Sequence, residues 1–226
     1  MITNDDGIDT AGLWALRDAV VALGYINWAI AAPLRQYSGC GHQTTTTSPI
    51  RVEARAENIY GIDGTPADCT RLAIACLFPQ VDWVLSGIND GGNMGVDIYT
   101  SGTVAAVREA TFHGVKGVAL SHYKLPNKEM DWQWASGVAQ RVLQELLSRD
   151  LPQHSYWNVN LPHLGGTAEP EFAFCPVSID PLPNEFSQIE EAYYYSGKYE
   201  LRQRSPATDV AECMGGKVAI SCIALA

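Results

Sequence analysis

The sequence is poor in basic residues and contains no long apolar run. It has 15 Lys and Arg against 25 Asp and Glu, a formal net charge of −10 at pH 7. Sequence-independent binding to nucleic-acid backbones requires clustered basic side chains, so this composition disfavours a nucleic-acid-binding protein. No apolar run approaches the roughly 20 residues that cross a bilayer, and the first residues lack the layout of an export signal. The sequence therefore predicts a soluble, cytoplasmic protein that binds neither duplex nucleic acid nor a membrane.

Paired cysteines are also missing. The six cysteines, at positions 40, 69, 76, 175, 213 and 222, form no CxxC motif. Scattered cysteines of this kind are typical of reduced thiols buried in the core of a cytosolic protein.

Several signatures of covalent and cofactor chemistry are absent. No serine has a glycine two residues before it, which excludes a nucleophile elbow, and there is no HExxH motif. The Gly-Lys pairs are followed by Tyr199 and Val218, so neither belongs to a P-loop. The stretch GCGHQT at 39–44 lacks the third glycine of a dinucleotide fingerprint, which disfavours an NAD-dependent enzyme.

The hydrophobic pattern predicts alternating strands and helices. Helices are expected over 11–23, 65–78, 101–114 and 131–149, and buried strands over 26–33, 81–88, 115–122 and 156–162. Thr65, Pro66 and Asp68 form a capping-box start for the second helix, and Ser101 is a candidate cap for the third. This alternation predicts an α/β fold with a mostly parallel sheet and helices on both faces.

The character of the chain changes after residue 165. We therefore divide it into a catalytic core, 1–165, and a C-terminal extension, 166–226. The extension contains three extended pieces, and the middle one is predicted to be a hairpin that turns at Ser196-Gly197. Three consecutive tyrosines on this hairpin favour a packing surface. Because a lone hairpin cannot bury both its faces, it should lie on the core or on another subunit.

Polar, glycine-rich stretches follow the predicted strands, where open parallel sheets bind ligands. These stretches place five side chains at the edge of the sheet where the parallel strands end, which we call the polar rim: Asp5, Asp6, Ser38, Asn89 and Asn93. Two carboxylates with hydroxyl and amide oxygens suit Mg²⁺ or Mn²⁺ rather than zinc. The alternative is that one of the aspartates caps the next helix and its neighbour is solvated.

The stretch TSGT at 100–103 opens a predicted helix. A helix N-terminus offers unpaired amides and the positive end of a dipole, which can hold a phosphate, and Ser101 and Thr103 add hydroxyl donors. Simple helix capping explains the same residues equally well.

Five segments together resemble the SurE family of stationary-phase survival proteins. In chain order they are TNDDGIDTAGLWALRDAV, SGCGH, GTPADCTRLA, SGINDGGNMGVDIYTSGTVAAVREA and NVNLP. The resemblance is dense over residues 2–163 and thin beyond them. It implies a Rossmann-like three-layer α/β/α core, with a C-terminal β-hairpin exchanged between the subunits of a homodimer or homotetramer.

The resemblance also implies a 5′/3′-nucleotidase, of the acid phosphatase type, that hydrolyses nucleoside monophosphates with metal-activated water. Carried over to this sequence, the ligands of one Mg²⁺ or Mn²⁺ per subunit are Asp5, Asp6, Ser38 and Asn89. The phosphate contacts fall at Asn93, Ser101, Gly102 and Thr103. Asp5 and Asp6 are the expected catalytic residues, with Asp6 as the proton acceptor.

Two features depart from the family pattern. Asp90 stands where the family often has Arg after SGIN, which removes a positive charge beside the expected phosphate. Only three residues precede Asn4, whereas a buried strand usually has about five, so the first strand is interpreted as clipped. The substitution at position 90 keeps a second hypothesis open, a non-catalytic nucleotide-binding or regulatory module on the same rim.

Overall fold

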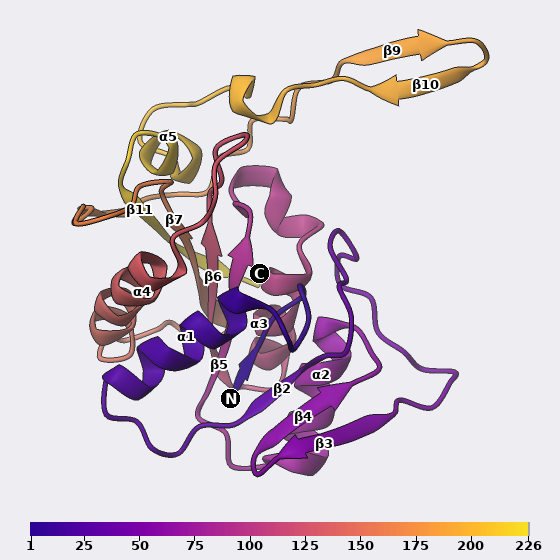
Figure 1. Cartoon of the computed structure of the whole chain (residues 1–226), viewed down its shortest axis with the longest axis vertical. Coiled ribbons are helices and arrows are strands. Elements are labelled where there is room, and N and C mark those ends of the chain that lie inside the picture. Colours follow the sequence, from indigo (N-terminus) through magenta and orange to yellow (C-terminus); the bar gives the residue numbers. More distant parts are fainter. Residues whose placement is uncertain (226) are drawn as a thin grey trace.

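The computed structural model describes residues 1–225 and has a nine-stranded sheet at its centre (Figure 1). The strands lie in the order β3-β4-β2-β1-β5-β6-β7-β11-β8. Their bounds are β1 Ile2–Thr3, β2 Ile30–Pro33, β3 Val52–Ala56, β4 Ile59–Ile62, β5 Trp83–Asp90, β6 Lys116–His122, β7 Ser155–Leu161, β8 Phe172–Phe174 and β11 Val218–Ala224. All neighbours from β4 to β7 are parallel, whereas β3 and β11 pair antiparallel with β4 and β7. The predicted mostly parallel sheet is confirmed.

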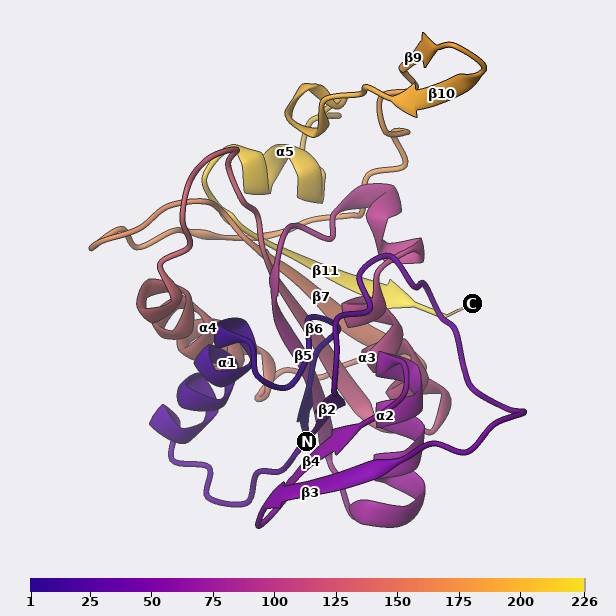
Figure 2. The same cartoon turned by 45° about the vertical axis from the view of Figure 1, so that its right-hand side comes forward.

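Helices cover both faces of the sheet. α1 (Ala11–Ala22) and α4 (Trp132–Leu146) lie side by side on one face, and α2 (Pro66–Leu72) and α3 (Gly102–Phe112) lie on the other (Figures 1 and 2). The arrangement is the three-layer α/β/α core that the sequence predicts. The remaining helical segments are the π-helical turn η1 (Ala73–Leu77), the 3-10 turns η2 (Gly95–Tyr99) and η3 (Tyr199–Leu201), and the short helix α5 (Asp209–Met214).

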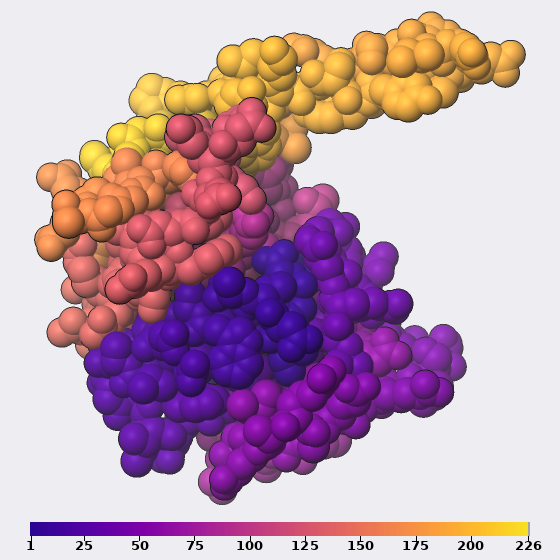
Figure 3. Space-filling model, viewed as in Figure 1, coloured from indigo at the N-terminus to yellow at the C-terminus, as the bar shows by residue number. Residues whose placement is uncertain are grey.

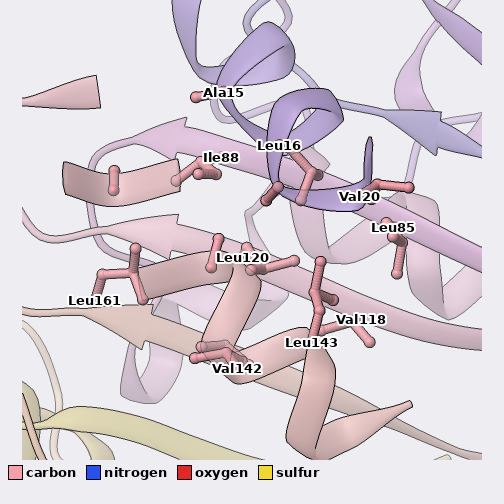
Figure 4. Close-up of a cluster of buried hydrophobic side chains, with 14 of the residues drawn as sticks. Ala15, Leu16, Val20, Leu85, Ile88, Val118, Leu120, Val142, Leu143 and Leu161 are labelled. Atoms are coloured by element: carbon pink, nitrogen blue, oxygen red, sulfur yellow. The ribbon is translucent and has the colours of Figure 1, made fainter. Parts of the chain in front are cut away.

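The main hydrophobic core lies between the sheet and the pair α1 and α4 (Figure 4). Leu16 of α1 and Leu143 of α4 are fully buried there against Leu120 of β6. Burying an aliphatic side chain of this size contributes roughly 1.5–3 kcal/mol. The strand ends that carry the polar rim are therefore mounted on a rigid support.

The helix starts follow the predicted signals. Thr65 and Asp68 form the reciprocal hydrogen bonds of a capping box at α2. Ser101 caps α3 by accepting a hydrogen bond from the Val104 amide at 3.1 Å, and Asp131 caps α4 in the same way. The predicted starts of α2 and α3 are confirmed, whereas the Asp131 cap was not predicted.

Two local predictions are wrong or incomplete. The hairpin of the extension has strands β9 (Phe186–Ile189) and β10 (Ala192–Tyr195), so it turns at Glu190-Glu191 and not at Ser196-Gly197. Glu190 adopts a left-handed φ of 55°, and the register places Tyr195 against Phe186, whose rings lie 5.6 Å apart. Aromatic pairing across the strands outweighs the preference for glycine in the turn. The predicted elements do not include β4, α5 and η2, all of which are short.

The cysteine prediction holds only in part. Cys69 and Cys213 are buried, but Cys76 and Cys222 are exposed, and all six thiols are free. Scattered spacing excluded a disulfide framework without fixing which side chains face the core.

The β9–β10 hairpin projects away from the rest of the molecule (Figure 3). Every residue of both strands is exposed, including Phe186, Tyr193 and Tyr195, which share one face of the hairpin. Of the two predicted locations, packing on the core of the same chain is thus wrong. Among residues 1–225, no helix is long and apolar enough to cross a membrane.

Candidate active site

The polar rim forms where the parallel strands β1, β2 and β5 end. Asp5 and Asp6 follow β1, which comprises only Ile2 and Thr3. Ser38 lies in the loop after β2, and Asn89 is the second-last residue of β5. Parallel neighbours end at the same edge of a sheet, so these side chains converge.

Asn4 and Gly7 shape the loop that carries the two aspartates. The Asn4 side chain donates to the Gly7 carbonyl at 2.9 Å and accepts from the Gly7 amide at 3.2 Å. Gly7 has a φ of +112°, which side chains rarely adopt, and it passes close to the Arg35 backbone. The sequence NDDG therefore closes a tight loop between β1 and α1, with its two carboxylates near the strand ends.

Asp5 is held against the start of α3. Its side chain is almost completely buried, and its Oδ1 accepts a hydrogen bond from the Thr103 hydroxyl. A Cβ on Gly102 would lie 2.8 Å from Asp5 Cβ and 3.0 Å from Asp5 Oδ2. Glycine at position 102 is thus what allows the helix N-terminus to approach the carboxylate this closely.

The two carboxylates have no directly paired basic side chain in the described part of the chain, although Lys124 is near enough to lower the Asp6 pKa slightly. Burial raises the pKa of Asp5 to about 6, and it also raises the pKa of Asp6. Neither residue forms an ion pair with a basic side chain within residues 1–225. The electrostatics of this part of the rim favour a bound cation.

The alternative role for these residues, capping the next helix, is wrong. The N-cap position of α1 is Thr10, and its side chain makes no capping hydrogen bond. Asp5 instead faces α3, and Asp6 accepts from the backbone amide of Asp90 at 3.1 Å.

Gln36 links Asp6 with Ser38, which the sequence analysis did not foresee. Its side-chain amide donates to Ser38 Oγ at 2.8 Å and lies 3.4 Å from Asp6 Oδ1. The Tyr37 amide also donates to the Asp5 carbonyl at 2.7 Å. The loop after β2 is therefore fastened to the aspartate loop, with Ser38 at its exposed edge.

Asn89 contacts its own loop through its side-chain nitrogen. Its amide nitrogen donates to the Gly91 carbonyl at 2.8 Å, which leaves Oδ1 as an acceptor for another partner. Together with two carboxylates and the Ser38 hydroxyl, this gives an oxygen donor set that fits Mg²⁺ or Mn²⁺. The described residues contain no cluster of three or more His, Cys, Asp or Glu side chains able to hold a metal, so the set depends on the amide and hydroxyl oxygens.

Asn93 is buried and is held by side chains of the neighbouring strands. Its backbone amide donates to Asn160 Oδ1 at 2.8 Å, and its carbonyl accepts from Asn158 at 2.9 Å and from Asn160 at 3.0 Å. Its own amide group donates to the Ser121 hydroxyl at 2.8 Å. These two asparagines of NVNLP hold the backbone of Asn93, a role that the motif alone does not indicate. Two buried asparagines on one face of a strand were the available signal.

The start of α3 faces the same rim. Ser101 Oγ is occupied as the cap acceptor, and the Thr103 hydroxyl is directed to Asp5. Capping, the simpler interpretation, is thus confirmed for Ser101, whose hydroxyl proton can still be donated to a ligand. The first amides of the helix have no carbonyl partner within the helix and offer donors beside Asp5.

Asp90 does not stand alone at the position where the family often has Arg. Lys124, from the loop after β6, pairs with Asp90 Oδ2 at 2.9 Å. Both side chains are exposed, so the positive charge at this edge of the rim comes from a different element. The sequence could not indicate it, because Lys124 is 34 residues away.

The comparisons with known proteins agree with this architecture. The profile of the family described as survival protein SurE matches residues 1–180. A Nostoc protein named "Putative 5'-nucleotidase" is 50% identical over 222 residues, covering 98% of this chain and 97% of its own length. The 5'-nucleotidase SurE of Pelobacter propionicus is 42% identical over 165 residues, covering 72% of this chain and 65% of its own. The crystal structure of the SurE protein from Aquifex aeolicus superposes with a TM-score of 0.89 at 28% identity, covering 100% of this chain and 92% of that one.

Proposed function

The chain belongs to the SurE family, and we propose that it hydrolyses nucleoside monophosphates to nucleoside and phosphate. The observation that carries the proposal is the adjacent pair Asp5 and Asp6, which forms no ion pair with a basic side chain in residues 1–225 and of which the buried Asp5 lies against the N-terminus of α3. A cation site next to a row of amide donors is the arrangement that phosphoryl transfer requires. The names of the relatives point to the same activity.

We assign the divalent cation, Mg²⁺ or Mn²⁺, to Asp5, Asp6, Ser38 and Asn89. When bound, such an ion would polarise a phosphoryl oxygen and make a water molecule more acidic. Thr103 orients the Asp5 carboxylate through its hydrogen bond, and Gln36 holds Asp6 and Ser38 together. The protein supplies the geometry, and no nucleophilic side chain is needed.

Asp6 is the proposed proton acceptor. It is half-buried, and burial raises its pKa, which makes the carboxylate a stronger base. Asn93, the Ser101 hydroxyl and the amides of Gly102 and Thr103 are the groups that we assign to stabilising the charge on the phosphoryl oxygens. The same site would accept a 3′-monophosphate, because these contacts involve the phosphate and not the sugar position.

A screen of metals against substrates tests this proposal. Phosphate release is measured from 5′- and 3′-nucleoside monophosphates with Mg²⁺, Mn²⁺ or a chelator. We expect turnover that requires the metal and disappears in Asp6→Asn. The matched control is Asp9→Asn, an exposed aspartate in the same loop, which should retain full activity. Nucleotide binding without any phosphate release would favour the non-catalytic module instead.

We also propose that the hairpin binds a second copy of this chain. An isolated two-stranded hairpin is marginal in water, and Phe186, Tyr193 and Tyr195 present an apolar face on it. Light scattering after gel filtration should give at least a dimer. Tyr193→Glu should shift it toward the monomer, whereas Ile26→Glu, at an exposed apolar residue on the body, should not. A monomeric wild-type chain would contradict the assignment.

Cytoplasmic location stays a prediction.

A further inference from the structure

The loop between β5 and α3 carries Asn93 and leads into Ser101, and the C-terminal extension contacts it. Asn93 itself is held by β6 and β7, as described above. The next residues, from Met94 to Asp97, are instead held by side chains more than 100 positions further along the chain. This second attachment has no part in the metal site.

Arg202 is the centre of that attachment. It is 3% exposed, and its guanidinium makes a 2.7 Å ion pair with Asp97 and a 3.2 Å hydrogen bond to the Met94 carbonyl. It also stacks over the Tyr199 ring at 4.8 Å, and the Tyr199 hydroxyl donates to the same Asp97 oxygen at 2.6 Å. A guanidinium can make two such contacts at once because its donors are arranged in a fixed planar fork.

Asp97 connects Arg202 with the start of α3, because it contacts both. Its backbone carbonyl accepts from the amides of Thr100 and Ser101, both at 3.1 Å. Gly95, two residues earlier, donates to Asp209 Oδ2 at 2.8 Å. A Cβ at Gly95 would lie 2.8 Å from the Arg202 guanidinium, so the loop backbone passes directly over the arginine.

We propose that Arg202 is a positioning residue that fixes the spacing between Asn93 and the N-terminus of α3. Since those groups are the assigned phosphate contacts, the inference rests on the proposed function of the site. Asp5 and Asp6 make none of the contacts of Arg202. Loss of Arg202 should therefore weaken the binding of phosphate and leave the metal requirement unchanged.

The test compares Arg202→Met with Arg204→Met, a control that removes an exposed guanidinium from the same segment. We expect Arg202→Met to raise KM and the inhibition constant of inorganic phosphate together, by about tenfold, since it removes the two hydrogen bonds that the guanidinium donates to Asp97 and Met94. The Mn²⁺ concentration for half-maximal activity should stay within about twofold of wild type, well short of the tenfold step that a lost contact would give. Arg204→Met should match wild type in all three quantities.

Conservative variants guard against a simple loss of folding. Arg202→Lys should restore part of the phosphate affinity, because an ammonium group can pair with Asp97 without also reaching Met94 in a fixed plane. Asp97→Asn should shift the phosphate inhibition constant in the same direction as Arg202→Met. A smaller fraction of folded enzyme lowers the apparent kcat and leaves KM unchanged. If these variants lower only kcat, with KM and phosphate inhibition unchanged, Arg202 affects only the amount of folded protein and the proposal is overturned.

Hydrogen exchange separates this proposal from the proposed function. In Arg202→Met the amides of residues 94–101 should exchange faster than in wild type, while those of β5 stay protected. If the wild-type protein releases no phosphate from any nucleotide, the proposed function fails, and this measurement still decides whether Arg202 holds the loop. Unchanged exchange over 94–101 would overturn the inference in either case.

Discussion

Replacing Asp5 with Asn should stabilise the metal-free protein while abolishing its activity. In the metal-free protein the Asp5 carboxylate is buried, and burial raises its pKa from 3.8 to about 6. Asparagine has nearly the same shape and no charge. The variant therefore keeps the packing against Gly102 and removes a charge that the folded state holds at a cost.

The magnitude follows from the pKa. Each unit by which folding raises a carboxylate pKa costs about 1.4 kcal/mol at high pH, so a rise from 3.8 to about 6 costs about 3 kcal/mol. Between these two pH values the folded protein holds a proton that the unfolded chain has released. Raising the pH through this window therefore destabilises the fold, and above it the cost is constant.

Thermal unfolding in the presence of a chelator measures this effect. At pH 8 we expect Asp5→Asn to gain about 1–3 kcal/mol, which corresponds to a rise in Tm of roughly 2–10 °C for a chain of this size. The gain should fall to about half at pH 5, where most of the Asp5 side chains are protonated. Mn²⁺ should raise the Tm of wild type and not that of the variant. A variant less stable than wild type at pH 8, or a gain equal at both pH values, would refute the reasoning.

Three further substitutions test the surroundings of the two aspartates. Gly102→Ala should lose activity and about 1–3 kcal/mol of stability, because the new Cβ would lie 2.8 Å from Asp5 Cβ; Gly137→Ala, with open space in α4, should gain up to about 1 kcal/mol in the same denaturation assay. Thr103→Val removes a hydrogen bond that lowers the Asp5 pKa, so the acid limb of the pH–rate profile at limiting Mn²⁺ should move to higher pH; an unmoved limb would contradict the contact. Lys124→Met should raise KM by less than about fivefold, and less so at high salt, since its pair with Asp90 is exposed.

The sequence predicted the fold well because its signals are local. Periodic apolar residues, caps such as Ser101 and the alternation of strands with helices each depend on neighbours a few positions away. These signals are sufficient for a parallel sheet with helices on both faces. They fail for β4 and for the turn at Glu190, where pairing with a distant or facing strand decides the conformation.

The candidate site was predicted in outline. Asp5, Asp6 and Asn89 could be placed on one rim, since the ends of parallel strands meet at one edge. Their roles as metal ligands, and the division of the chain at residue 165, stay predictions.

What the sequence by itself determined is the chemistry of the rim, because oxygen donors and helix-opening residues are visible as residue types. Only the tertiary structure decided which partners hold them. Gln36 between Asp6 and Ser38, Asn158 and Asn160 around Asn93, and Arg202 under Asp97 all come from other elements of the fold. A hydrogen bond joins atoms about 3 Å apart in space, and its partners can be far apart in the sequence. Such contacts leave no pattern in the spacing of residues, so they are seen only in the folded chain.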